Sequence, residues 1–121
     1  MLDTHLLLWA LSSPARLSRR ARQKIDASEV FVSAASIWEI SIKGSLGKLE
    51  ADPDEVLQAI EPAGFHHLYI AGEHAARVAQ LPAIHKDPFD RLLVAQARVE
   101  LMILLTNDAI LGDYGDLVEV V

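Results

Sequence analysis

Acidic side chains recur in four short motifs along the chain, and carboxylates are the side chains that bind hard divalent cations. Each motif lies where an apolar, β-type run passes into a helix, or one turn inside that helix. If the strands are parallel, all four motifs lie at one edge of one sheet, where open α/β folds bind ligands. We therefore expect the acids to converge in one pocket. The motifs are Leu2-Asp3-Thr4-His5, Ser36-Ile37-Trp38-Glu39-Ile40, Asp87-Pro88-Phe89-Asp90-Arg91 and Thr106-Asn107-Asp108.

The chemistry expected of such a pocket is metal-assisted hydrolysis. Carboxylates held close together repel one another, so they either keep protons or bind divalent cations. Mg²⁺ takes oxygen ligands and commonly shares its coordination shell with phosphate oxygens. One ion can lower the pKa of a bound water, and a neighbouring ion can stabilise the leaving oxygen of a phosphodiester. The chain contains no cysteine, which excludes thiolate catalysis and zinc–sulfur sites.

Each motif also has a purely structural explanation. Ser36 and Glu39 have the spacing of a capping box. Asp87 precedes a proline and is a natural N-cap, and the acid three residues later lies in the first helical turn. Asp3 and Asp108 can be caps in the same way. For one motif alone, capping is favoured by roughly two to one, but capping does not require four helix starts to be gathered together, whereas a metal site does.

Two cations near the acids are candidate substrate contacts. Lys43 follows Glu39 by one helical turn, so it either forms an ion pair with that acid or contacts the scissile phosphate, and we favour the pair. Arg91 lies beside Asp90 and can pair with an acid or with RNA, and the sequence does not choose between them. The histidines show no metal-ligand spacing, although His85 flanks the expected pocket. Both tryptophans, Trp9 and Trp38, are expected in the core.

Length and composition indicate one domain over residues 1–121. The chain is 51% apolar, with a mean hydropathy of +0.22, so it can bury a core without disulfides. No segment approaches the ~20 apolar residues that span a bilayer, and a soluble, cytoplasmic protein is expected. The net charge of −6 argues against binding nucleic acid by bulk charge, but not against a nuclease whose metal ions meet the phosphate. We expect a basic run to be a solvated helix face: Arg16, Arg19, Arg20, Arg22 and Lys24.

Helices and strands are expected to alternate. This alternation indicates an α/β fold with a parallel sheet covered by helices on both faces. Strands are expected at 30–33, 67–70, 102–105 and 117–121, and helices at 4–11, 17–27, 36–44, 52–64, 73–81 and 87–99, with a short turn or helix at 109–112.

The same motifs carry a resemblance to a known family. LDTH at 2–5, VSAASIWEISIK at 32–43, HKDPFDRLLVAQA at 85–97 and LLTND at 104–108 resemble, in this order and spacing, the PIN-domain ribonucleases. The particular resemblance is to VapC-type toxins of toxin–antitoxin pairs. It spans almost the whole chain. One motif such as TND would be weak evidence, but the four in sequence are specific.

The resemblance implies a three-layer α/β/α PIN-like domain around a parallel sheet of about five strands. It also implies an endoribonuclease toxin that hydrolyses RNA, forms a homodimer and is inhibited by a cognate antitoxin. The catalytic and metal-binding quartet would be Asp3, Glu39, Asp90 and Asp108, holding Mg²⁺ or Mn²⁺. Thr106 and Asn107 would support the site. Beside the resemblance, Thr4 and Asp87 are candidate supporting residues, and Lys43 and Arg91 are the candidate substrate contacts.

Two alternatives belong to other classes of protein. A phosphoacceptor receiver domain also gathers acids at strand ends, but it needs an acceptor aspartate after a central strand, and the strand at 67–70 is followed by Ala71-Gly72. A PIN-like scaffold that binds RNA or protein without cutting remains open. The presence of all four acids counts against loss of activity without proving activity.

Overall fold

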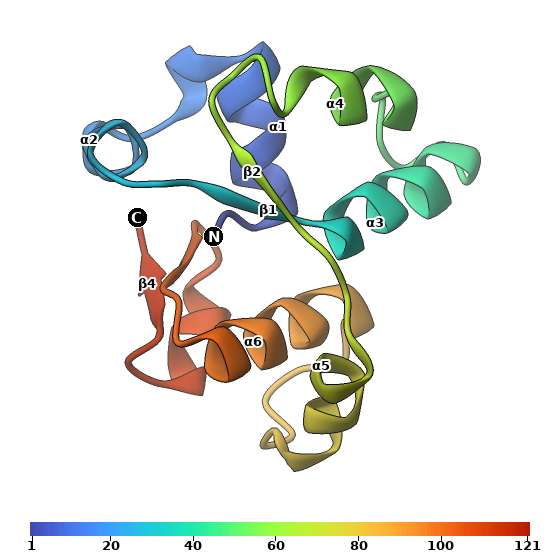
Figure 1. The fold of residues 1–121 in the computed structure, drawn as a ribbon, viewed down its shortest axis with the longest axis vertical. Coiled ribbons are helices and arrows are strands. Elements are labelled where there is room, and N and C mark those ends of the chain that lie inside the picture. Colours follow the sequence, from blue (N-terminus) through green and yellow to red (C-terminus); the bar gives the residue numbers. More distant parts are fainter.

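The strands of the computed structural model, which describes residues 1–121, form two parallel pairs (Figure 1). β1 (Phe31–Ser33) pairs with β2 (His66–Leu68), and β3 (Leu104–Thr106) pairs with β4 (Val118–Val120). Leu2 lies between the pairs: its N–H donates to the Phe31 carbonyl at 3.2 Å, and it forms a parallel bridge with Leu105. The parallel α/β arrangement is confirmed. One sheet of about five strands is not, because the first segment contributes only this bridge.

Helices connect the strands and form most of the regular structure. The 3₁₀ segments follow α1, continue α5 and connect β3 to β4. No helix is both long and apolar enough to cross a bilayer. The α-helices are α1 (Thr4–Ser12), α2 (Arg19–Ala27), α3 (Ala34–Ser45), α4 (Pro53–Ala59), α5 (Gly72–Arg77) and α6 (Pro88–Glu100), and the 3₁₀ helices are η1 (Pro14–Arg16), η2 (Val78–Gln80) and η3 (Ala109–Tyr114).

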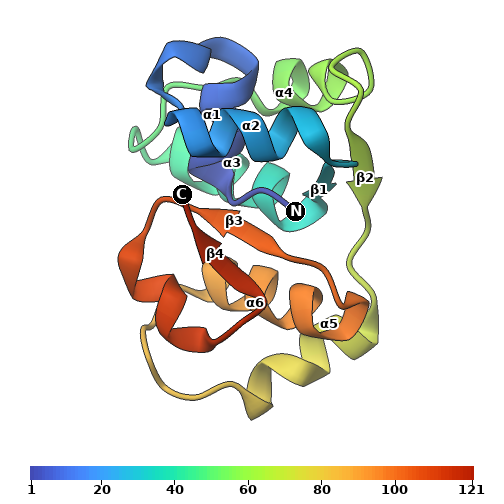
Figure 2. The ribbon, with the colours of Figure 1, turned by 90° about the vertical axis from the view of Figure 1, so that its left-hand side faces the viewer.

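Two hydrophobic clusters lie on opposite faces of the strands. Successive strand residues point to opposite faces, and Leu104 belongs to the cluster under α6 whereas Leu105 belongs to the cluster under α1. Figure 2 shows the same division, with α1 to α4 on one side of β3 and β4, and α5 and α6 on the other. Met1 and Leu2 divide between the clusters in the same way. The helices therefore cover both faces, as the alternation predicted.

The polar side chain of Gln96 ties the buried helix α6 to the end of β1. It is fully buried, and its Oε1 accepts a 2.5 Å hydrogen bond from the Ser33 hydroxyl. Its Nε2 donates to the Tyr69 carbonyl at 3.4 Å. Because buried polar groups are costly when unpaired, these bonds set where α6 lies along β1. That position in turn fixes the first turn of α6, where Asp90 lies.

The start of α3 differs from the sequence prediction. Ser33 is the N-cap, its hydroxyl accepting from the Ala35 N–H at 3.0 Å, so the helix begins two residues earlier than expected. The capping-box interpretation of Ser36 and Glu39 is therefore wrong. Trp38 was also misplaced: it is 53% exposed rather than in the core, because it lies on the outer side of α3.

The core prediction is tested with two leucines. Leu93 of α6 is fully buried, whereas Leu46 at the end of α3 is 62% exposed. Leu93→Ala should lower the free energy of unfolding by about 2–5 kcal/mol, because it leaves a cavity that the packed helices fill only in part. Leu46→Ala should change it by less than about 0.5 kcal/mol. Urea denaturation measures both, and equal effects would contradict the assignment of the core.

Candidate active site

Three of the four predicted acids lie at a helix start and Glu39 lies one turn further along its helix, but the helices do not all follow strands. Asp3 caps α1 directly after the Leu2 bridge, and Asp108 caps η3 after β3. Glu39 lies in the second turn of α3, which follows β1. Asp90 lies in the first turn of α6, which is reached through a loop from η2 and not from a strand. The expectation that every motif follows a β-type run was wrong for this one.

Asp3 is buried and uses both carboxylate oxygens. Oδ1 accepts from the Leu6 N–H at 2.9 Å and caps α1, while Oδ2 accepts from the Thr106 hydroxyl at 2.5 Å. Burial raises the pKa of Asp3 above its usual range, although these hydrogen bonds oppose the rise, and the nearby Glu39 adds to it. Thr106 therefore contacts the first acid of the predicted quartet directly. The Asp3 side chain therefore caps α1 with one oxygen and contacts Thr106 with the other.

Glu39 is also buried and receives donors from two helices. Its Oε1 lies 2.6 Å from the Thr4 hydroxyl, which is itself 3.0 Å from the Ser36 hydroxyl. Its Oε2 is paired with the Lys43 ammonium, one turn later on α3. The ion pair that we favoured for Lys43 is therefore present. Thr4 holds the other oxygen of the carboxylate, and Ser36 in turn contacts Thr4.

Lys43 reaches a second acid on α6. Its Nζ lies 3.5 Å from Oδ2 of Asp87 and 5.8 Å from the centre of the Phe89 ring. Partial burial would lower its pKa, but Glu39 and Asp87 outweigh that and raise it. Asp87 is an N-cap as expected, its Oδ1 accepting from the N–H groups of Phe89 and Asp90 at 2.9 and 3.1 Å. Lys43 thereby links α3 to the start of α6.

The negative charge of the Asp90 carboxylate is unfavourable in this arrangement. Burial raises its pKa to about 6, and the carboxylates of Asp87, Glu39 and Asp3 contribute in that order. Its side chain is 21% exposed, and Oδ2 lies 3.5 Å from Nε2 of His85. Thr4 of α1 contacts Glu39, and Lys43 joins Glu39 to Asp87 at the start of α6. The acids of α1, α3 and α6 are therefore close enough to influence one another electrostatically.

The last predicted motif is only partly joined to this group. Asp108 is exposed, and its Oδ1 accepts from the Ile110 N–H at 3.1 Å. Asn107 is exposed and its side chain makes no hydrogen bond. The backbone of Asp108 is nevertheless held by the site, because its N–H donates to the Thr106 hydroxyl at 3.0 Å. Asp108 thus lies at the edge of the acidic group rather than within it.

Arg91 does not pair with an acid. Its guanidinium donates to the Pro82 carbonyl at 2.9 Å, to the Tyr114 hydroxyl at 3.0 Å and, at longer range, to the carbonyls of Val78 and His85. These contacts hold the loop before α6, which argues against the substrate contact we had considered. Tyr114 was missed by the sequence reasoning, because an isolated buried tyrosine 23 positions from Arg91 carries no pattern.

Comparison with known families gives an independent result. A family model described as PIN domain matches residues 1–117. The chain belongs to the PIN domain family. No curated protein matches it. Among solved structures, this PIN domain is similar to a toxin–antitoxin complex from Klebsiella pneumoniae, with 18% identity, a TM-score of 0.66, and coverage of 98% of this chain and 93% of that chain. At this identity the likeness shows the fold.

The donors of this PIN domain suit a hard divalent cation in their chemistry. They are carboxylate and hydroxyl oxygens, and oxygen donors are the ones that Mg²⁺ and Mn²⁺ prefer. The side chains around them carry too few positive charges to balance the carboxylates. In the present arrangement no three acidic or histidine side chains lie close enough together to hold one ion. Lys43 occupies one oxygen of Glu39, and Thr106 occupies one oxygen of Asp3. A cation would therefore compete with Lys43 for Glu39.

The electrostatic strain on Asp90 predicts a pH-dependent effect of neutralising it. The folded-state pKa of Asp90 is about 6, above the ordinary value of 3.8. The protonated carboxyl therefore contributes fully to the free energy of unfolding below about pH 4, and this contribution is lost as the pH rises through 6 and the group ionises. In EDTA at pH 7.5, Asp90→Asn should raise the free energy of unfolding by about 1–3 kcal/mol. The gain should vanish near pH 4. Urea titrations at both values measure it, with the exposed Asp116→Asn as control; a gain that is equal at both pH values would contradict the prediction.

Proposed function

We propose that this PIN domain is a metal-dependent endoribonuclease toxin that hydrolyses RNA phosphodiester bonds and is inhibited by a cognate antitoxin. The observation that supports this most is the gathering of Asp3, Glu39 and Asp90, from three separate helices, within electrostatic range of one another. Helix capping alone does not require that arrangement. Membership of a family whose members are in general metal-dependent nucleases supports the same reaction.

The acids of the proposed site are held by named donors. Asp3, Glu39 and Asp90 would supply oxygen ligands, with Asp108 completing the quartet from the edge. Thr106 aims Asp3, and Thr4 aims Glu39. A bound Mg²⁺ or Mn²⁺ would supply Lewis acidity and a water of lowered pKa. Lys43, released from Glu39 when a cation takes that oxygen, would contact the phosphate, while Asn107 lies exposed beside the site.

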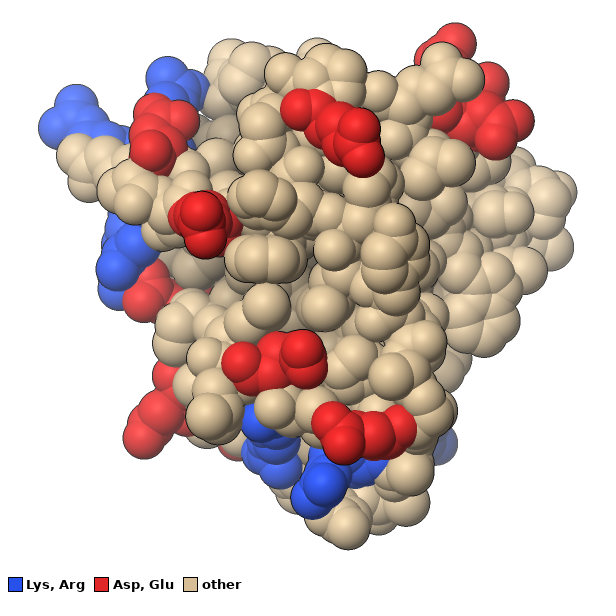
Figure 3. Space-filling view, in the orientation of Figure 1, with Lys and Arg blue, Asp and Glu red and all other residues tan.

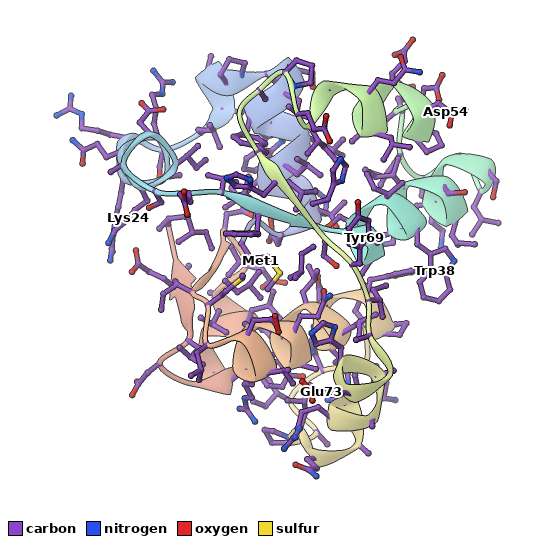
Figure 4. All side chains as sticks on the ribbon, viewed as in Figure 1. Met1, Lys24, Trp38, Asp54, Tyr69 and Glu73 are labelled. Carbon is purple, nitrogen blue, oxygen red and sulfur yellow. The ribbon has the colours of Figure 1, made fainter.

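A protein partner is supported by apolar side chains left on the surface of α3 and α4. Trp38 projects away from α3 in Figure 4, and a hollow of about 430 Å³ lies between α3, α4 and the end of β2. Apolar patches of this kind commonly mark protein interfaces. We assign this surface to the antitoxin or to a second copy in a homodimer. The exposed residues are Trp38, Ile42, Leu46 and Leu57.

Charge on the surface does not by itself indicate an RNA-binding face. Figure 3 shows basic side chains at the edge of the molecule over α2 and again at its lower end, and acidic side chains are scattered beside both groups. Arg20 and Lys24 of that run lie 3.4 and 3.5 Å from Oε2 of Glu119. They are thus partly neutralised within the chain. RNA binding is therefore assigned to the metal-loaded acidic site.

The proposal is tested by cleavage of a panel of structured RNAs with purified protein in Mg²⁺ or Mn²⁺, against EDTA. Asp90→Asn should lower the rate by about a hundredfold or more, because it removes one charge from the proposed ligand set while keeping the shape. Asp116→Asn, which changes an exposed aspartate outside the site, should cut at the wild-type rate.

Two outcomes would contradict the proposal. Cleavage that survives both EDTA and Asp90→Asn would show a contaminating nuclease or a misplaced site. No cleavage of any RNA by protein that binds Mn²⁺ would favour the non-catalytic scaffold. That second candidate is kept because no three acids converge closely enough to hold an ion in this structure.

A further inference from the structure

A row of hydrogen-bonding groups leads from the loop before α6 to Asp90. The Arg91 guanidinium donates to the Tyr114 hydroxyl at 3.0 Å, and that hydroxyl lies 2.8 Å from Nδ1 of His85. The other ring nitrogen of His85, Nε2, is buried, makes no hydrogen bond and lies 3.5 Å from Oδ2 of Asp90. None of these three residues is needed to cap a helix. Their arrangement therefore calls for another explanation.

The direction of the hydrogen bonds follows from the donors available. Arg91 can only donate, so the Tyr114 oxygen accepts from it, and the tyrosine proton remains to be given away. Tyr114 is only 5% exposed, and the group that its hydroxyl meets besides Arg91 is Nδ1 of His85. Tyr114 therefore donates to Nδ1. In the neutral ring the proton must then be on Nε2, the nitrogen that faces Asp90.

The first member of the row is itself held firmly. Arg91 also donates to the carbonyls of Pro82, Val78 and His85. These contacts order both η2 and the loop that carries the histidine. The His85 ring in addition packs edge-on against the Tyr114 ring, with centroids 5.5 Å apart. The ring is thus restrained both in its plane and in the placement of its protons.

We propose that Arg91, Tyr114 and His85 form a directed hydrogen-bond chain that holds the His85 ring with its Nε2 proton aimed at Oδ2 of Asp90. His85 is then a positioning residue: it orients the Asp90 carboxylate, leaving Oδ1 for a divalent cation. A buried N–H is costly without an acceptor, and Oδ2 of Asp90 is the acceptor that faces this one. The role in cation binding rests on the proposed function, whereas the chain of hydrogen bonds does not.

Partners that orient a metal-binding side chain typically contribute 10- to 100-fold to affinity or activity. Tyr114→Phe deletes only the hydroxyl and keeps the ring, so it should free the His85 ring to exchange its proton between the two nitrogens. It should weaken Mn²⁺ binding about tenfold. The matched control is Tyr69→Phe, which deletes the hydroxyl of a tyrosine that is 75% exposed.

The first experiment reads the ring itself. In full-length protein with ¹⁵N-labelled histidine at pH 8, where histidine is ordinarily neutral, long-range ¹H–¹⁵N correlation spectra distinguish a protonated ring nitrogen from a bare one. We expect His85 to carry its proton on Nε2 in the wild type and in Tyr69→Phe, and a mixture of the two forms in Tyr114→Phe. A proton on Nδ1 in the wild type would overturn the chain.

The second experiment measures Mn²⁺ affinity by electron paramagnetic resonance of the free ion, alongside RNA cleavage. His85→Gln can keep an N–H near the Nε2 position, whereas the side chain of His85→Asn is too short to do so. The asparagine variant should therefore lose about tenfold in Mn²⁺ affinity, and the glutamine variant clearly less. The two variants keep the proposal testable if Tyr114→Phe folds poorly. The exposed His66→Asn is the control.

Failure of this inference can be told from failure of the proposed function. If the wild type binds Mn²⁺ and cuts RNA but Tyr114→Phe and His85→Asn behave like their controls, the positioning role is overturned and the nuclease stands. If the wild type binds no Mn²⁺ and cuts nothing, the proposed function and the role toward a cation are overturned together. The ring spectra then still decide whether the hydrogen-bond chain exists.

Discussion

The repulsion among buried carboxylates is the constraint on which the rest of this structure depends. Asp3 and Glu39 are buried, and Asp90 lies within electrostatic range of both. Taking even one such charge out of water is costly unless hydrogen bonds or opposite charges compensate. The fold therefore surrounds the acids with donors. Two of these donors come from distant parts of the chain: Thr4 contacts Glu39, and Thr106 donates to Asp3.

The three carboxylates do not receive equal numbers of hydrogen-bond donors or cations. This difference distinguishes the acids that are held in place from the acid that has little to hold it. Asp3 has a backbone N–H and the Thr106 hydroxyl, and Glu39 has Thr4 and Lys43. Asp90 has only His85, at 3.5 Å. A site built for stability alone would not leave a carboxylate so poorly partnered beside two others. The deficit of positive charge lies where a divalent cation would remove it.

Much of the fold could be predicted, because helix caps and apolar periodicity are local signals. The N-caps at Asp3, Asp87 and Asp108 were readable from the residues beside them. Two features were not. Short strands leave a weak pattern, so the five-stranded sheet was inferred from resemblance and only two pairs and a bridge are observed. The contacts of Arg91 and Tyr114 join distant segments through single side chains, and no periodicity records such contacts.

The bond between Asp3 and Thr106 joins residues 103 positions apart. Contacts of such separation form late, because a long loop must close before they repay its entropy. During synthesis, therefore, the emerging chain carries its first acid for a long time without the hydroxyl that aims it. The acidic group cannot be assembled until residue 106 has left the ribosome.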